Sequence, residues 1–277
     1  MRKTVVTSFT EDGYRTYGKD FIESFRKHWP SGVDLVVYYE GDNLREDWHF
    51  IEEVEGLEEW MERIDPFPLF KGDLGDGTYD IQRDARMVRK CLIQTHAAKV
   101  YGGKVFWIDA DVFTFDDIPS DFLDKMLPDD KFSCFLGRDH WPEAKSGQLW
   151  PSYTESGFLG FNVNHPLAPH FFGAYLEIPR SGLLFTMQSW HDCICYDLAR
   201  HAFKNNQDDF VNITGNLPAN THPFVNSILG KYMDHKKGKR KTSKSKPEDM
   251  VVERSEAYWS EKEDGPVIVT DPASAWG

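Results

Sequence analysis

The chain has 277 residues, 40% of them hydrophobic and 14% aromatic, a composition that is typical of a globular protein and excludes an intrinsically disordered one. This length is enough for one large α/β domain or two small ones. The formal net charge of −13 excludes a protein whose whole surface is built to bind nucleic acid.

The sequence carries no signal for membrane insertion, secretion or disulfide formation. The N-terminal residues MRKTVVTSF lead directly into a short β-branched run, and no apolar run approaches the roughly 18 residues of a membrane span. The four cysteines form no CxxC pair, which argues against a disulfide framework and a zinc ribbon. We therefore expect a cytoplasmic protein with reduced thiols and no membrane span.

Strand-like and helix-like segments alternate along the chain, which is typical of a parallel α/β sheet. Residues 4–9 predict a first strand, residues 14–29 carry apolar residues at helical spacing, and residues 33–39 predict a second strand. The Pro-Ser-Gly sequence at residues 30–32 ends the helix. Such a βαβ unit places its loops at the carboxyl edge of the sheet, where open α/β sheets bind ligands.

A second helix and a third strand lead to an acidic motif. We predict a helix over residues 81–101, ended by the glycines at 102 and 103, and then the strand VFWI at residues 105–108. Asp109 and Asp111 follow, and side-chain alternation in an extended chain sends both carboxylates to the same side. Two carboxylates so close repel each other, and a divalent cation such as Mn²⁺ or Mg²⁺ removes that repulsion. Two solvated acids in a loop are the alternative.

Four segments in a fixed order form a pattern more specific than any single motif. They are YGGKVFWIDADVF, ESGFLGFNVN at residues 155–164, SWHDCICYD at residues 189–197, and HKKGKRK at residues 235–241. The pattern resembles the GT-A glycosyltransferases with a DxD motif, in particular the retaining glycogenin and bacterial lipopolysaccharide galactosyltransferase type. The third segment has His-Asp where that family has Asp-Gln.

The resemblance implies a fold class and a domain organisation. The fold class is α/β of the GT-A type, a Rossmann-like nucleotide-diphospho-sugar transferase with a mostly parallel central sheet flanked by helices. The transferase domain is expected over residues 1–235, and a basic C-terminal segment and tail over residues 236–277.

The resemblance also implies a metal site. Asp109, Asp111 and His235 correspond to the metal ligands of the family, and an imidazole beside two carboxylates suits Mn²⁺ or Mg²⁺. The alternative for His235 is a solvated residue in a flexible basic tail, because motif matches arise easily in Lys-rich tracts.

A second group of residues is expected to contact the nucleotide-sugar donor. These residues are Thr7, Tyr14, Arg83, Arg86, Lys90, Asp109 and Lys241. Arg83, Arg86 and Lys90 lie at helical spacing before the DxD strand, and a solvated helix face is the alternative for them. Lys241 is assigned to the diphosphate by the resemblance. Tyr14 offers a ring for stacking on a nucleobase, whereas Phe9 is expected to pack in the core.

Asp192 and its neighbour His191 are the candidate catalytic residues. The resemblance places Asp192 at the donor or acceptor sugar, although Ser189-x-x-Asp192 is also a capping-box pattern at the start of a helix. Zinc bound by His191, Cys193 and Cys195 is disfavoured, because residues two apart on a helix point to different faces.

These features predict a metal-dependent glycosyltransferase that moves a sugar from a nucleotide diphosphate donor, a UDP-sugar by resemblance, to an unidentified hydroxyl acceptor with retention. In this function the metal ion acts as a Lewis acid on the leaving diphosphate. The sequence identifies no general base.

Other classes of function stay open. A phosphohydrolase of the haloacid dehalogenase type is disfavoured, because that family needs Thr or Val two residues after its second Asp and this chain has Phe113 there. A protein that binds nucleotide or nucleic acid without catalysis is the second alternative. It rests on eight basic residues against the single acid Asp234: Lys231, Lys236, Lys237, Lys239, Arg240, Lys241, Lys244 and Lys246. A transferase that glycosylates a modified DNA base would combine both features.

Overall fold

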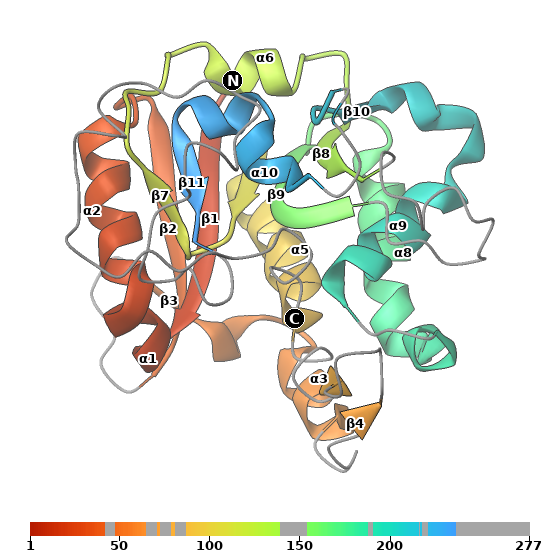
Figure 1. Cartoon of the computed structure of the whole chain (residues 1–277). Helices are drawn as coiled ribbons and strands as arrows, with labels where there is room; N and C mark the ends of the chain where they lie inside the picture. The colour runs from red at the N-terminus through yellow and green to blue at the C-terminus, as the bar shows by residue number, and fades with distance from the viewer. Residues whose placement is uncertain are drawn as a thin grey trace.

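In the part of the chain that the structure describes, the central sheet has seven strands in the order β10-β8-β9-β6-β1-β2-β3 (Figure 1). The strands are β1 (Lys3–Thr10), β2 (Val33–Glu40), β3 (His49–Phe50), β6 (Lys104–Ile108), β8 (Ser133–Gly137), β9 (Thr154–Asn162) and β10 (Phe210–Asn212). Only β9 runs antiparallel to its neighbours β6 and β8, and every other pairing in this sheet is parallel. The predicted α/β fold with a mostly parallel sheet is confirmed.

The structure is a computed structural model that describes residues 1–41, 48–64, 71–72, 79–80, 87–138, 154–187, 191–215, 217 and 221–236. Within this part of the chain, two short antiparallel pairs accompany the main sheet, β4 (Lys71–Gly72) with β5 (Tyr79–Asp80) and β7 (Val112–Thr114) with β11 (Met233–His235). Nowhere in these ranges does a helix have the length and apolar character needed to cross a membrane.

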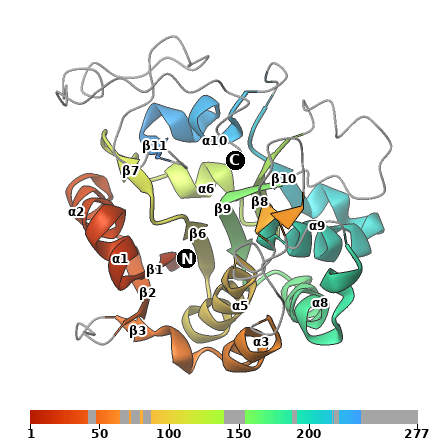
Figure 2. The ribbon, with the colours of Figure 1, turned by 60° about the horizontal axis from the view of Figure 1, so that its bottom comes forward.

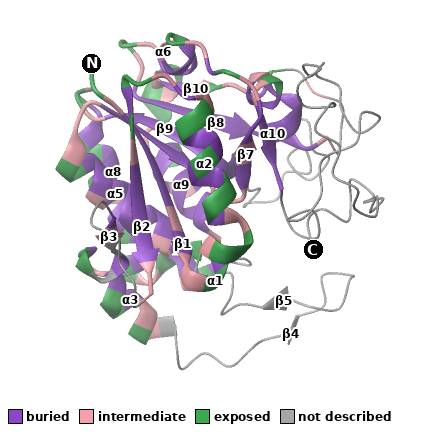
Figure 3. Cartoon of the chain, turned by 90° about the vertical axis from the view of Figure 1, so that its left-hand side faces the viewer, coloured by how far each residue is buried: buried purple, intermediate pink, exposed green. Residues whose placement is uncertain are grey.

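Helices cover both faces of the sheet (Figure 2). On one face lie α3 (Leu57–Ile64), α5 (Arg89–Tyr101), α8 (Ala168–Ser181) and α9 (Asp192–Ala202), which share a buried core with β6 and β9. On the other lie α2 (Lys19–His28), α6 (Phe122–Met126) and α10 (Pro223–Asn226), together with the pair β7 and β11. The sheet between these two layers is buried along most of its length (Figure 3).

The predicted first βαβ unit is confirmed, but its helix is not uniform. A short helix α1 (Glu11–Gly13), capped by the Thr10 hydroxyl, leads into a π-helical turn over Tyr14–Gly18 and then into α2. π-helical turns occur frequently at functional sites. This one lies directly after the carboxyl end of β1.

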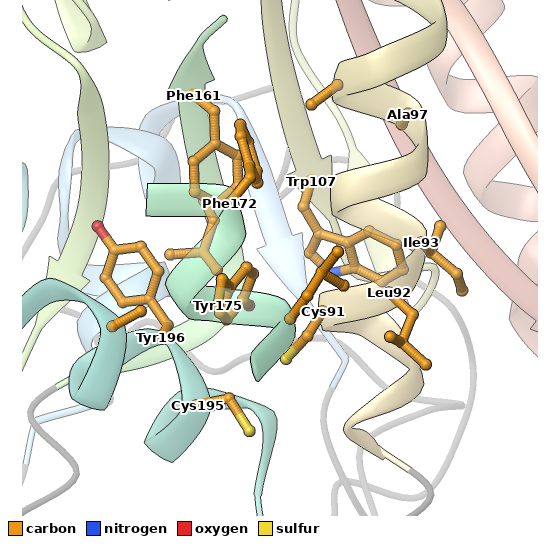
Figure 4. Close-up of a cluster of buried hydrophobic side chains, with 14 of the residues drawn as sticks. Cys91, Leu92, Ile93, Ala97, Trp107, Phe161, Phe172, Tyr175, Cys195 and Tyr196 are labelled. Atoms are coloured by element: carbon orange, nitrogen blue, oxygen red, sulfur yellow. The ribbon is translucent and has the colours of Figure 1, made fainter. Parts of the chain in front are cut away.

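The predicted helix before the DxD strand is confirmed over Arg89–Tyr101, and Gly102 and Gly103 end it with positive φ angles of 61° and 66°. Lys99, near the C-terminal end of α5, is exposed. Since α5 is packed against both the sheet and the helices α8 and α9, its buried positions extend around most of its circumference (Figure 4). Residues 81–86 of this prediction lie outside the described residues.

All four cysteines are buried, and none of them forms a disulfide. Cys91 and Cys195 belong to the core between α5, α8 and α9, where Tyr175 and Tyr196 also pack (Figure 4). Burial raises the pKa of the Cys134 thiol well above its usual range, and that of Cys195 likewise. These thiols are therefore protonated packing groups, not nucleophiles.

Candidate metal and donor site

Asp109, Asp111 and His235 meet where β6 ends. Asp109 directly follows β6, Asp111 directly precedes β7, and His235 is the last residue of β11, opposite Val112 in the β7 and β11 pair. One ligand atom from each of the three side chains lies within 4.8 Å of the others. His235 is 1% exposed, so the alternative of a solvated tail residue is wrong. In the part of the chain that is described, no other group of His, Cys, Asp and Glu has this geometry.

Backbone and side-chain hydrogen bonds hold the two carboxylates in place. The amide of Asp109 donates to the carbonyl of Gly157 at 3.0 Å, and the indole of Trp107 donates to Oδ1 of Asp109 at 2.7 Å. The amide of Lys236 donates to the carbonyl of Asp111 at 2.9 Å, which ties the end of β11 to the motif. The site is therefore assembled by three segments, β6, β9 and β11.

The imidazole of His235 completes the group. Its Nε2 lies 3.1 Å from Oδ1 of Asp111 and 3.8 Å from Oδ2 of Asp109. Two carboxylates and one imidazole supply the oxygen and nitrogen ligands that suit Mn²⁺. The donor set therefore fits a hard divalent cation, and Mg²⁺ is the other candidate.

The absence of a side chain at Gly157 leaves room for the imidazole of His235. A Cβ at this residue would lie 2.7 Å from Cε1 of His235 and 3.2 Å from Oε1 of Glu155, so only glycine fits between them. Glu155 is 1% exposed and forms an ion pair with Arg138 at 2.7 Å. Neither Glu155 nor Arg138 was predicted to belong to the site. The available signal was an acid two residues before a glycine at the start of a buried strand.

Lys90 lies inside the acidic group. Its Nζ is 2.7 Å from Oδ1 of Asp109 and 3.3 Å from Oδ2 of Asp192, and it lies 5.7 Å from the centre of the Trp107 ring. Burial alone would lower the pKa of Lys90, but the charges of Asp109 and Asp192 outweigh burial and raise this pKa above its usual range. Lys90 is thus a buried cation, and the alternative of a solvated helix face is wrong for it.

Asp192 begins α9 and is buried beside Lys90. The N-cap of α9 is His191, which has an extended backbone and makes no side-chain capping bond. The first residue of the predicted capping box, Ser189, lies outside the described residues, and α9 begins at Asp192. An acid in the first turn is still favoured by the helix dipole. Among the residues that the structure describes, Cys193 and Cys195 belong to no group that could hold a metal ion.

An aromatic cluster lies next to the carboxyl end of β1. Phe9 is buried and packs on Tyr14 and Trp48, with ring centroids 5.6 Å and 5.4 Å away, so its predicted place in the core is confirmed. Tyr14 is partly exposed and meets Trp48 edge to face. Thr7 is fully buried within β1, and its hydroxyl has no hydrogen-bond partner among the described residues.

Tyr17 also lies near the two carboxylates. From the sequence it was predicted only to lie in the helix over residues 14–29. It lies in the π-helical turn after β1. Burial, and then the negative charges of Asp111 and Asp109, raise the pKa of its phenol. Tyr17 is therefore a neutral hydrogen-bonding group at neutral pH.

Three predicted donor contacts, Arg83, Arg86 and Lys241, lie outside the described residues, as does the basic tract after Lys236. Lys236, the first residue of the predicted C-terminal segment, is buried, with its ammonium 5.1 Å from the centre of the Phe113 ring. The domain boundary at residue 235 stays a prediction.

Comparison with solved structures finds glycosyltransferases. The WbbM bifunctional glycosyltransferase is 13% identical with a TM-score of 0.47, and the match covers 76% of this chain and 38% of that one. Mouse xyloside xylosyltransferase 1 is 11% identical with a TM-score of 0.44, covering 76% and 84%. The galactosyltransferase LgtC, in complex with donor and acceptor sugar analogues, is 14% identical with a TM-score of 0.43, covering 76% and 73%. No protein-family model and no curated protein sequence matches the chain.

Proposed function

We propose that this chain is a metal-dependent glycosyltransferase that moves a sugar from a nucleotide diphosphate donor to a hydroxyl acceptor. The observation that carries the proposal is the group of Asp109, Asp111 and His235 at the carboxyl edge of a mostly parallel sheet. Ligands bind at this edge in open α/β folds. The sequence pattern adds a UDP-sugar as the donor and retention as the stereochemical outcome.

The chain's own groups suit a site for a cation and a diphosphate. Asp109, Asp111 and His235 would hold Mn²⁺ or Mg²⁺, which neutralises charge on a leaving diphosphate. The three side chains are at most 15% exposed, so their charges act in surroundings that screen them weakly. Their backbone is fixed by β6, β9 and β11, and this rigidity preorganises the ligands.

The residues around the metal group are assigned to parts of the donor according to their positions. Lys90 and Asp192 flank Asp109 on the side of α5 and α9, and we assign them to the transferring sugar, with His191 beside them. Tyr14, the partly exposed member of the aromatic cluster, is assigned to the nucleobase. Thr7 has no part in the proposal, because its side chain is fully buried.

The residues outside the described ranges keep the roles that the sequence pattern gives them. Arg83 and Arg86 are proposed to contact the donor, and Lys241 is proposed to contact its diphosphate. Each assignment is tested by substitution with Gln and measurement of the donor Kd.

Thermal stabilisation by ligands tests the proposed function. UDP and Mn²⁺ together should raise the melting temperature of the wild-type chain, because a ligand that binds only the folded state stabilises it by mass action. Asp111→Asn should abolish this increase, and the matched control Asp130→Asn, at an exposed acid, should retain it. A stabilisation that persists in chelator, or in Asp111→Asn, would contradict the metal site. Incubation with a panel of UDP-sugars then identifies the sugar.

A further inference from the structure

Lys90 and a metal ion would share one carboxylate. The Lys90 ammonium lies 2.7 Å from Oδ1 of Asp109, and the Trp107 indole donates to the same oxygen. The other oxygen, Oδ2, faces Nε2 of His235 at 3.8 Å. Asp109 therefore already has a cation on one side and the proposed metal position on the other.

This arrangement carries an electrostatic cost for cation binding. A buried ammonium in contact with a metal ligand reduces the negative charge that the ligand offers, and it repels a second cation. Lys90 also has another anion close by, since Oδ2 of Asp192 lies 3.3 Å away. The ammonium can thus remain paired when its contact with Asp109 weakens.

We infer that Lys90 is an internal counterion of the acidic site, which keeps the affinity of the free protein for a divalent cation low and makes cation binding depend on the diphosphate of the donor. The inference rests on the proposed function. A diphosphate adds negative charge beside Lys90 and the cation, so it relieves the repulsion between them. Because coupling between two ligands is reciprocal, the cation strengthens diphosphate binding by the same factor.

A purely structural ion pair predicts a different result. If Lys90 only stabilises the fold, its substitution lowers the melting temperature and leaves the metal affinity of the folded protein unchanged or lower. An internal counterion requires the opposite, a gain in metal affinity when the ammonium is removed.

The test is a titration with Mn²⁺ alone, followed by electron paramagnetic resonance of the free ion. Lys90→Gln should bind Mn²⁺ on the order of tenfold more tightly than the wild type. The matched control is Arg89→Gln, which removes the neighbouring positive charge, paired with Glu40. It should change the Kd by less than about twofold. Equal or weaker binding by Lys90→Gln, or an equal gain in Arg89→Gln, would overturn the inference.

Asp192→Asn gives an independent measurement if Lys90→Gln does not fold. Without the second carboxylate the ammonium stays with Asp109, so the Kd for Mn²⁺ should rise several-fold, on the order of the effect of one nearby charge. An unchanged or lower Kd would contradict the inference.

A second titration at saturating UDP measures the coupling and separates the two proposals. The ratio of the Mn²⁺ Kd values without and with UDP should be smaller in Lys90→Gln than in the wild type, and an equal ratio would contradict the inference. If the wild type binds Mn²⁺ and Asp111→Asn does not, the metal site stands whatever Lys90 does. If the wild type binds no Mn²⁺ with or without UDP, the proposed function and the inference both fail.

Discussion

Nε2 of His235 lies 3.1 Å from a carboxylate oxygen of Asp111, although 124 residues separate them in the sequence. The contact exists because β11 pairs with β7, the strand that begins directly after Asp111. The short strand β11 therefore does more than extend the fold, since it delivers the third member of the candidate metal group.

The first prediction concerns Asp111→Asn. Although Lys90 is paired with Asp109, the carboxylates of Asp109 and Asp111 still repel each other in the absence of a divalent cation. The substitution should therefore leave the melting temperature unchanged or slightly higher. Turnover of a nucleotide sugar should fall by about 100-fold or more, and Mn²⁺ affinity should fall with it, because an amide oxygen is a poorer ligand for a hard cation. Calorimetry and a Mn²⁺-dependent turnover assay measure both effects. A variant that unfolds, or one that works normally in chelator, would refute the metal site.

The second prediction compares His235→Ala with Met233→Ala in the same strand. Both side chains are buried, so both substitutions should destabilise the fold, Met233→Ala by about 2 to 5 kcal/mol. Only His235→Ala should weaken Mn²⁺ binding, because only His235 belongs to the metal group. Chemical denaturation and Mn²⁺ titration separate the two effects. Equal losses of Mn²⁺ affinity in the two variants would show that β11 acts through stability alone.

The third prediction compares two glycines of β9. A Cβ at Gly157 would meet the His235 ring, whereas a Cβ at Gly160 would meet Cys134 and Phe106, away from the acidic pair. Each substitution by Ala should cost about 1 to 3 kcal/mol through overpacking. Gly157→Ala should also raise the Kd for Mn²⁺ by displacing the imidazole, and Gly160→Ala should not. The prediction fails if the metal Kd of Gly157→Ala equals that of Gly160→Ala.

The fourth prediction concerns pH and the opposite edge of the sheet. Burial acts to raise the pKa of Asp124, but hydrogen bonds from Lys3 and Lys104 outweigh it and hold this pKa below the unfolded value of 3.8. The carboxylate therefore contributes stability above pH 3.8, and this stability is lost as the pH falls through the lowered pKa. Asp124→Asn should lower the melting temperature at pH 7, and the difference from the wild type should shrink below about pH 4. A difference that is constant with pH would contradict this assignment.

Much of the fold could be predicted from the sequence, because hydrophobic periodicity and turn residues are local signals. The strands around Val5 and Val36 and the strand that ends at Ile108 lie where their apolar runs predict. The burial of α5 around most of its circumference could not be predicted, because it depends on the packing of this helix against both the sheet and the helices α8 and α9.

The residues of the candidate site could be predicted where they lie in one sequence motif. They could not be predicted where they are distant in the sequence and meet only in the folded structure. Asp109 and Asp111 are two residues apart, so their common orientation follows from alternation. The pairing of Glu155 with Arg138, and the position of Glu155 and His235 on either side of Gly157, depend on the register of β9 in the sheet. Register depends on contacts between distant segments, which a single sequence does not display.

The pairing of β7 with β11 also sets an order of events during synthesis of the chain. The acidic pair is translated long before the imidazole that completes it, and β7 can gain its partner only after residues 233 to 235 have left the ribosome. A nascent chain that has already formed its first βαβ unit and the strand β6 therefore presents two carboxylates without their histidine. The ability to hold the cation is therefore complete only when β11, the last strand in the described part of the chain, has been made.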